Sequence, residues 1–310
     1  MPTESLATSI NPVAPFDFEL TAGYHTYFQS RYGSDNMEDG VYSRLLNLGD
    51  KLVLAKVHSI GTVDAPELTM ELQGAVLEPE DVALAKVRIS WLLGADQDLA
   101  PFYGLTLGDK AMSGLIEKLY GLHVPHTATV FEALVLAVLG QQISTGVARI
   151  IRTLMVETFG HCAEFGGETF YAFPKPEAIR ESSPAELHTM KLTQRKSEYI
   201  HGLAVTALDP AVCLEYMDDL TDQEIVNKLT ALRGVGLWTA QWALIRGVGR
   251  PDALPLGDLA LRRIVSRMFF GGEDVNDSQV EEIASRWSPY RTLLPLPICS
   301  VPYAWAQANH

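Results

Sequence analysis

The chain has 310 residues, a formal net charge of −14 and a pI near 5.0. Its length is sufficient for one large or two ordinary domains, and its acidity excludes a uniformly basic surface that attracts nucleic acid at long range. No apolar run approaches the ~18 residues of a membrane span, the N-terminus lacks signal-peptide features, and the three cysteines are scattered. We therefore expect a cytoplasmic protein without a membrane segment, a disulfide framework or a zinc site.

The first part of the chain predicts a small α+β domain. Residues 1–13 show no hydrophobic periodicity, and we expect them to be disordered. Over residues 14–108 the alternation of apolar and polar residues predicts strands, followed by one helix. The expected strands are 16–20, 52–57 and 68–72, and the expected helix is 79–93. This arrangement indicates an antiparallel sheet with a helix on one face.

The second part, residues 109–310, predicts an almost entirely helical domain. Apolar residues recur there at helical spacing between capping and turn residues. The expected helices are 129–139, 144–159, 192–204, 221–232, 237–245 and 280–287. The predicted fold class is therefore α+β, with a sheet domain before a helical core.

A glycine hairpin is expected between two of these helices. Thr221 and Glu224 form a capping box that starts the first helix, and Gly234 and Gly236 end it. The first amide N–H groups of the next helix have no intrahelical partner, so this site suits a phosphate without any lysine or arginine. The alternative is a glycine C-cap between two helices of a bundle.

Asp258 stands sixteen residues after Trp242 and begins the next predicted helix. Aspartate is a favoured N-cap, so a capping role is the simplest interpretation. The short distance from the glycine hairpin gives a second interpretation, in which one carboxylate is presented to a bound nucleic acid.

At these residues the chain resembles the helix-hairpin-helix DNA glycosylase superfamily, and within it the alkylpurine branch. The resemblance rests on residues 232–240 (LRGVGLWTA) followed by 255–258 (PLGD). Weaker segments follow the same order, namely 139–144 (LGQQIS), 172–177 (AFPKPE) and 287–291 (WSPYR). Together these segments extend the resemblance from about residue 14 to 305.

The resemblance implies a fold and a set of roles. It implies a sheet domain before a helical core in two lobes, with the site between the lobes. Gly234, Val235, Gly236 and Thr239 would bind the DNA phosphate, with a monovalent cation held by hairpin carbonyls as in relatives. Asp258 would be the catalytic carboxylate. Three scattered cysteines exclude the iron–sulfur cluster of some relatives, and no other cofactor or metal is expected.

The chemistry of N-glycosidic cleavage agrees with a single acid. Bond breakage places oxocarbenium charge on the deoxyribose, which a nearby carboxylate stabilises. A purine alkylated at N3 or N7 is already cationic, so it leaves without a second acid. Bifunctional relatives have a lysine at position 238 that forms a Schiff base. Trp238 therefore implies a monofunctional enzyme that uses water.

Trp238 and Trp242 are expected to line the base pocket. They are four residues apart, so they lie on one helical face. Electron-rich rings attract a cationic base by up to ~2 kcal/mol when desolvated, whereas a neutral purine gains only stacking. The alternative is that both tryptophans only pack in the core.

The turn after Gly140 is expected to fill the gap that a flipped base leaves. Gln142 occupies the family's wedge position, where alkylpurine relatives often have leucine. A glutamine can hydrogen-bond the orphaned base, whereas a leucine can only pack. Alternatively, Gln141 and Gln142 are capping residues of a kinked helix.

The far wall of the base pocket departs from the family pattern. A tryptophan found in relatives falls in register at Cys299, and Trp305 can replace it only from a shifted position. Aromatic residues of the sheet domain, Tyr24, Tyr27 and Phe28, are the other candidates for this wall.

Positive charge is concentrated near the hairpin. Six arginines lie between Arg233 and Met268, at positions 233, 246, 250, 262, 263 and 267, and Lys191, Arg195 and Lys196 lie upstream. These side chains would contact phosphates if they share a face. The alternative is ordinary solvated helix surface.

These features predict a monofunctional DNA glycosylase that flips out and excises alkylated purines in base excision repair. Two alternatives stay open at this point: a glycosylase for oxidised or deaminated bases, and a non-catalytic DNA-binding module. The expected partner is double-stranded DNA, and we expect a monomer.

Overall fold

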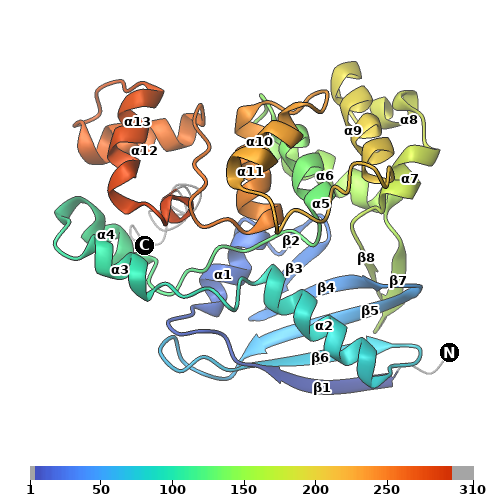
Figure 1. Cartoon of the computed structure of the whole chain (residues 1–310). Helices are drawn as coiled ribbons and strands as arrows, with labels where there is room; N and C mark the ends of the chain where they lie inside the picture. Colours follow the sequence, from blue (N-terminus) through green and yellow to red (C-terminus); the bar gives the residue numbers. More distant parts are fainter. Residues whose placement is uncertain (1–3, 295–310) are drawn as a thin grey trace.

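The computed structural model describes residues 4–294 and confirms the α+β prediction. A six-stranded antiparallel sheet in the order β1-β6-β5-β4-β3-β2 forms the base of the molecule, and most of the helices lie above it (Figure 1). In chain order the strands are β1 (Glu4–Ile10), β2 (Arg31–Tyr32), β3 (Asp35–Glu38), β4 (Val41–Leu48), β5 (Lys51–Ser59) and β6 (Leu68–Gly74).

The two faces of the sheet have different covers. Helix α2 (Pro79–Leu92) packs on one face through Ala85 and Ile89. On the other face, Leu45 and Leu54 pack against a two-stranded hairpin, β7 (Cys162–Phe165) and β8 (Glu168–Tyr171). The sequence prediction missed this hairpin. Gly166 and Gly167 have φ values of 61° and 85°, as a tight hairpin turn requires.

The prediction of a disordered N-terminus is wrong for residues 4–10. These residues form β1, which pairs antiparallel with β6 from Glu4 opposite Gly74 to Ile10 opposite Leu68. The side chains of β1 are mostly exposed, so the strand is held by main-chain hydrogen bonds rather than by a buried face. A strand of this kind leaves no hydrophobic periodicity in the sequence.

The predicted strand 16–20 is also wrong, because helix α1 (Phe18–His25) begins within it. Asp17 is the N-cap, and its carboxylate accepts a hydrogen bond from the N–H of Leu20 at 2.9 Å. Phe16 and Phe18 are both buried in the sheet core. The alternation that suggested a strand is thus a helix cap flanked by two buried rings.

The remaining helices lie in two groups (Figure 1). The first group consists of α5 (Val130–Gly140), α6 (Thr145–Phe159), α7 (Pro176–Glu181), α8 (Pro184–Thr189), α9 (Gln194–Ala207), α10 (Asp222–Thr230) and α11 (Leu237–Ala243). The second consists of α3 (Ala100–Thr106), α4 (Lys110–Lys118), α12 (Leu259–Phe269), α13 (Asp277–Ala284) and the short helices η2 (Ser285–Trp287) and η3 (Arg291–Leu293). A π-helical turn, η1 (Leu244–Val248), continues α11.

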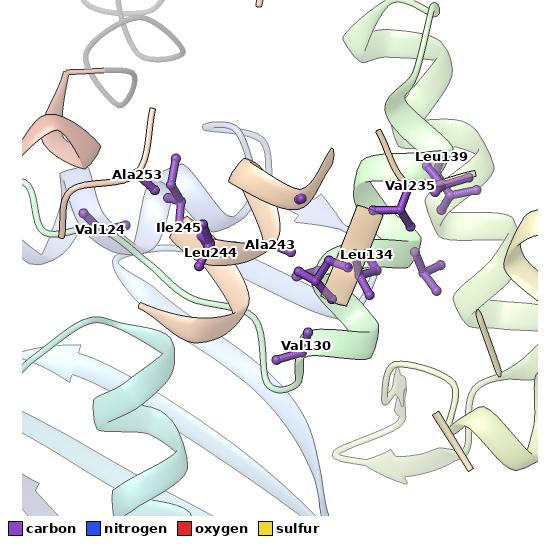
Figure 2. Close-up of a cluster of buried hydrophobic side chains, with 14 of the residues drawn as sticks. Val124, Val130, Leu134, Leu139, Val235, Ala243, Leu244, Ile245 and Ala253 are labelled. Atoms are coloured by element: carbon purple, nitrogen blue, oxygen red, sulfur yellow. The ribbon is translucent and has the colours of Figure 1, made fainter. Parts of the chain in front are cut away.

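One hydrophobic core runs through both groups. Figure 2 shows part of it, where Leu134 of α5 lies near Val235 and where Ala243, Leu244 and Ile245 continue along α11 and η1. The predicted boundary between residues 108 and 109 stays a prediction. Leu99 and Phe102, which precede it, already pack in this helical core.

A buried group of charges joins the sheet to the helices. This interface charge cluster consists of Asp35 on β3, Tyr42 and Arg44 on β4, Glu132 on α5 and Arg152 on α6, all buried. The cluster has one member on α5 and one on α6, and these two helices flank the turn at Gln142. It therefore anchors both helices that carry this turn to the sheet.

Candidate active site

The glycine hairpin joins α10 to α11, as the sequence predicts. Thr221 and Glu224 form the expected capping box at the start of α10. Gly234 has a φ of 91°, and a Cβ at this position would overlap the Tyr199 ring, so only glycine fits. Gly236 is extended and exposed, and it is the N-cap of α11. The first amides of α11 therefore begin at an accessible turn.

Val235 and Thr239 are less accessible than their predicted phosphate contacts require. Val235 is buried in the helical core, and its N–H is donated to the Leu232 carbonyl at 3.1 Å. Thr239 is also buried, and its hydroxyl accepts a hydrogen bond from Gln141 at 3.0 Å. The phosphate grip stays a prediction, with Gly236 as its most exposed member.

Asp258 is the N-cap of α12, and both of its oxygens accept hydrogen bonds. Oδ1 accepts from the N–H groups of Ala260 at 2.8 Å and Leu261 at 3.0 Å. Oδ2 accepts from the Trp238 indole Nε1 at 2.9 Å. The capping interpretation is therefore correct, but it accounts for only one oxygen. The other oxygen lies at the junction of α11 and α12.

The two tryptophans lie beside this carboxylate. The rings of Trp238 and Trp242 meet edge to face, with 6.3 Å between centroids and 69° between planes. Both side chains are half-buried. Trp242 also packs against the helical core, as the alternative interpretation expected. The structure thus brings Asp258, Trp238 and Trp242 together, while their contact with a base stays a prediction.

The turn between α5 and α6 presents Gln142. This residue is exposed and has a φ of 58°, which is unusual for a residue with a side chain. Gln141 points inward instead, and its Nε2 donates to the Gly234 carbonyl at 3.2 Å and to the hydroxyl of Thr239. Gln141 therefore ties the predicted wedge turn to the glycine hairpin.

Lys196 on α9 binds the same turn. The expectation of a phosphate contact is wrong for this residue. Lys196 is buried, and its Nζ donates to the carbonyls of Leu139 at 2.8 Å and Gln141 at 2.6 Å. Burial lowers the pKa of Lys196 below its usual range. The two carbonyls lie at the C-terminus of α5, where they have no hydrogen-bond donor within the helix, and Lys196 is the donor for both.

Three of the six arginines near the hairpin serve the fold, and the other three are exposed. Arg233 pairs with Glu198 at 2.7 Å, and Arg250 donates to the carbonyls of Met217 and Leu220. Arg246 stacks on the Tyr24 ring, and Arg262 donates a hydrogen bond to the Val275 carbonyl. Arg263 and Arg267 are exposed. Arg233, Arg263 and Arg267 therefore remain exposed, so cationic contacts with phosphate would add to those of the main-chain amides.

The C-terminal motif that suggested the family has a structural role. Trp287 is buried, and Arg291 donates two hydrogen bonds to Asp252, both at 2.8 Å. These bonds outweigh the effect of burial and lower the pKa of Asp252. Cys299 and Trp305, named as candidates for the pocket wall, lie outside the described residues.

The candidates for this wall from the sheet domain lie at the end of α1. Tyr24 is buried, and its ring stacks on that of Tyr27 with 5.8 Å between centroids. Tyr27 and Phe28 both have positive φ. Their role as a pocket wall stays a prediction.

Among residues 4–294, no group of His, Cys, Asp or Glu side chains could hold a metal ion, and no helix could span a membrane. The monovalent cation at the hairpin stays a prediction. Two carbonyls of the hairpin, those of Leu232 and Gly234, already accept hydrogen bonds.

A cavity of about 300 Å³ lies at the far end of η1, away from Asp258. Its lining includes Gln97 from the segment after α2 and His126 from the segment before α5, together with Gly249 and Tyr290. Among the candidate site residues, Arg250 lines it, whereas Asp258, Trp238 and Trp242 do not.

Sequence reasoning missed the roles of three residues near the site: Gln141, Lys196 and Arg246. Arg246 follows Trp238 by eight residues and Trp242 by four, so helical periodicity alone would have placed it on the same face. The contacts of Gln141 and Lys196 join segments 55 to 98 residues apart, and no local pattern indicates them.

Comparisons with known proteins identify the family of the chain. Residues 135–289, half of the chain, match the HhH-GPD superfamily of base excision DNA repair proteins. A DNA-3-methyladenine glycosylase of Bacillus subtilis (strain 168) is 27% identical over 277 residues, which cover 89% of this chain and 91% of that protein. DNA-3-methyladenine glycosylase 2 of Escherichia coli (strain K12) is 23% identical over 239 residues, 74% of this chain and 81% of that protein.

A solved structure agrees with these relatives. The 3-methyladenine DNA-glycosylase from Archaeoglobus fulgidus has a TM-score of 0.83 and 26% identity, covering 96% of this chain and 98% of that chain. The family match includes the turn at Gln142, the glycine hairpin and Asp258. The chain therefore belongs to the HhH-GPD superfamily of base excision DNA repair proteins.

Proposed function

We propose that this protein is a monofunctional DNA glycosylase that excises alkylated purines from double-stranded DNA. Relatives that match nearly the whole chain are named DNA-3-methyladenine glycosylases. The carrying observation is the hydrogen bond from Trp238 Nε1 to Asp258 Oδ2. In this bond the Asp258 carboxylate contacts the indole of Trp238. Position 238 is the one at which a lyase would need a lysine.

The reaction needs one carboxylate and one water. The bond between C1′ and the purine nitrogen breaks, and its electron pair leaves with the base. The positive charge that develops on the sugar is stabilised by Asp258, which also orients the attacking water. Water adds to C1′, and the proton that it loses passes to bulk solvent. Because the alkylated purine starts as a cation, it departs neutral and needs no general acid.

The hydrogen bonds of Asp258 serve this role by fixing its orientation. Oδ1 is held by two amides at the start of α12, and Oδ2 is held by the indole of Trp238. A group that is fixed before the reaction costs no reorganisation when charge develops. The ring that holds the carboxylate also offers its face to a cationic base.

The way the protein binds DNA follows from its charge. With a net charge of −14 and with three of the six arginines near the hairpin held in internal contacts, phosphate binding depends mainly on Gly236 and the first amides of α11. Gln142 enters the duplex where the target base leaves it. We therefore expect affinity that changes less steeply with salt than for a protein with 6–10 cationic phosphate contacts.

The test compares two aspartates that have the same capping role. Asp109 caps α4 by accepting hydrogen bonds from two amides, as Asp258 does for α12. Asparagine is also a good N-cap, so both Asp→Asn variants should fold. In single-turnover assays on methylated duplex DNA, Asp258→Asn should lose about 100-fold or more in release of methylpurines. Asp109→Asn should keep the wild-type rate.

Equal release by wild type and Asp258→Asn would overturn the catalytic role. Binding without release by either protein would favour the DNA-binding module. Borohydride treatment during the reaction should trap no covalent complex, because no lysine stands at position 238 to form a Schiff base. A trapped complex, or faster release of 8-oxoguanine than of methylpurines, would favour the oxidised-base alternative.

A further inference from the structure

One face of the helix formed by α11 and η1 leads away from Asp258 into the protein. Trp238, Trp242 and Arg246 follow one another at intervals of four residues, so they lie along this face. Two helical turns separate Trp238 from Arg246, a rise of about 12 Å. Asp258 bonds the first of the three, and the ring of the second contacts the first. The pocket face, as we call these four residues, thus has a catalytic end and an inner end.

The inner end is held in place by two segments distant in sequence. The Arg246 guanidinium lies 5.0 Å from the centroid of the Tyr24 ring on α1. The Arg246 carbonyl accepts hydrogen bonds from the N–H of Thr127 at 2.7 Å and from its hydroxyl at 3.1 Å. Arg246 lies in the last turn of the π-helical segment η1, where a carbonyl has no partner within the helix, so its carbonyl is available to Thr127. Such turns occur frequently at functional sites.

Two N–H donors on this face are buried without a partner. Among residues 4–294, neither Trp242 Nε1 nor Arg246 Nε has a hydrogen-bond partner, and Arg246 forms no ion pair with a described carboxylate. A buried donor without an acceptor costs free energy, so it calls for a specific explanation. Two such donors one helical turn apart, on the face that begins at the catalytic carboxylate, are explained by a ligand that brings an acceptor.

We infer that Trp242 and Arg246 form the floor of the base pocket and bind the oxygen at position 6 of a guanine-type base. Guanine derivatives carry an acceptor oxygen there, whereas adenine derivatives carry an amino group that donates. An adenine amino group at this position would face the N–H groups of Trp242 and Arg246, and because all three groups are donors, no hydrogen bond could form. A guanidinium also repels a cationic base unless an acceptor oxygen lies between them. This inference rests on the proposed function and adds a preference for 7-methylguanine over 3-methyladenine.

The experiment measures the ratio of two excision rates. Single-turnover rates are determined for 7-methylguanine and 3-methyladenine in the same methylated duplex, for wild type, Trp242→Phe and Arg246→Met. The intrinsic lability of each lesion cancels when the ratio of a variant is divided by that of wild type. Loss of one hydrogen bond to the oxygen should lower the ratio about three- to tenfold. Hypoxanthine, a neutral base with the same oxygen, should lose rate in parallel with 7-methylguanine.

The variants separate recognition from packing. Trp242→Phe keeps an aromatic ring and removes the N–H together with the rest of the fused pyrrole ring, so it tests the inference even if Arg246→Met fails to fold. Arg286→Met is the matched control, because Arg286 lies 5.9 Å from the Phe269 ring, outside the pocket face. It should leave the ratio unchanged.

The outcomes also distinguish this inference from the proposed function. If wild type releases neither base, the proposed function fails. If wild type releases both bases and the ratio stays constant in Trp242→Phe and Arg246→Met, the floor assignment is overturned and the glycosylase assignment stands. A constant ratio with a lowered melting temperature would show that Arg246 only joins η1 to α1.

Discussion

Two regions of this molecule bury polar side chains, and they do so in opposite ways. In the interface charge cluster, Arg44 donates to Asp35 at 2.6 Å and to both oxygens of Glu132 at 2.9 and 2.8 Å. Arg152 donates to the second oxygen of Asp35 at 2.8 Å, and Tyr42 donates to the first at 2.7 Å. Every charge in this cluster has a counter-charge within hydrogen-bonding distance.

The pocket face, formed by Trp238, Trp242, Arg246 and Asp258, is incomplete by comparison. Asp258 accepts three hydrogen bonds, yet Trp242 Nε1 and Arg246 Nε remain unpartnered among residues 4–294. Arg152 Nε is also unpartnered, but its guanidinium has Asp35 as a counter-ion, whereas within residues 4–294 Arg246 has the face of the Tyr24 ring and no counter-ion. A complete cluster indicates a structural role, and an incomplete one indicates a site that a ligand completes.

The electrostatics of the interface charge cluster show how strongly its members depend on one another. Burial would raise the pKa of Asp35, but Arg44, His25 and Arg152 together hold it well below its usual range. Burial would lower the pKa of Arg44, but Asp35 and Glu132 raise it. Removal of one member therefore leaves a buried charge uncompensated.

The largest expected effect comes from Asp35→Asn, which should disrupt the interface charge cluster and leave the pocket face intact. Two buried guanidinium groups lose their shared carboxylate, and the free energy of unfolding should fall by about 3–5 kcal/mol. Urea unfolding measures this loss. Asp50→Asn, at an exposed position in the turn between β4 and β5, is the control and should change little. If Asp35→Asn lowers excision without lowering stability, the contrast between the two regions is wrong.

Lys196→Met should have the next largest effect, because it acts on both folding and the wedge turn. The two carbonyls that Lys196 binds would lose a charged donor, and the free energy of unfolding should fall by about 2–3 kcal/mol. The rate of base release should also fall, since Gln141 and Gln142 are then no longer fixed relative to the hairpin. Lys191→Met removes the same charge from an exposed position. A loss of DNA binding shared by both variants would be due to charge, and only the excess in Lys196→Met would report the turn.

Acid should act on the interface charge cluster through His25, whose ring lies 3.8 Å from Asp35. Burial lowers the pKa of His25 from 6.5 to about 3, and Asp35 offsets this only in part. Between these two values the unfolded chain binds one more proton than the folded chain does at this residue. Stability is thus complete above pH 6.5 and is lost as the pH falls, by about 1.4 kcal/mol per pH unit.

The measurement is the free energy of urea unfolding between pH 7 and pH 4. His25→Gln should reduce the slope against pH by about 1.4 kcal/mol per unit. The same change at the exposed His58 should leave the slope in place. An unchanged slope in His25→Gln would show that other groups, such as the buried His126 with a pKa lowered by burial to about 4, carry the acid sensitivity.

What the sequence could predict follows from how local each interaction is. The helix starts at Thr221 and Asp258 were predictable because a cap and its amides lie within three residues of one another. The turn at Gln142 and the glycine hairpin were located by their motifs. By contrast, β1 pairs with a strand more than 50 residues away, so no periodicity within residues 4–10 announced it.

The polar contacts show the same limit. The carboxylate of Asp35 bonds residues 7, 9 and 117 positions away, and Lys196 reaches carbonyls more than 50 positions away. A buried charge in a sequence does not name its partner, since the partner depends on the packing of distant elements. Trp238 and Asp258 were both predicted as site residues, but the hydrogen bond between them, across 20 residues, needed the fold.

The smallest expected effect on stability is at Gln142. Substitutions there test whether its backbone strain serves the site rather than the fold. Its φ of 58° is unfavourable for a residue with a Cβ, and glycine adopts it freely. Gln142→Gly should therefore raise the free energy of unfolding by about 0.5–1 kcal/mol, after the greater entropy of glycine in the unfolded chain is included. Gln142→Ala keeps the strain and should leave stability unchanged. Both variants lose the wedge, so both should excise methylpurines from duplex DNA more slowly but act normally on single strands, where no gap needs filling. A parallel loss on duplex and single strands, or no loss in either, would exclude the wedge role and leave the strained turn as a structural link between α5 and α6.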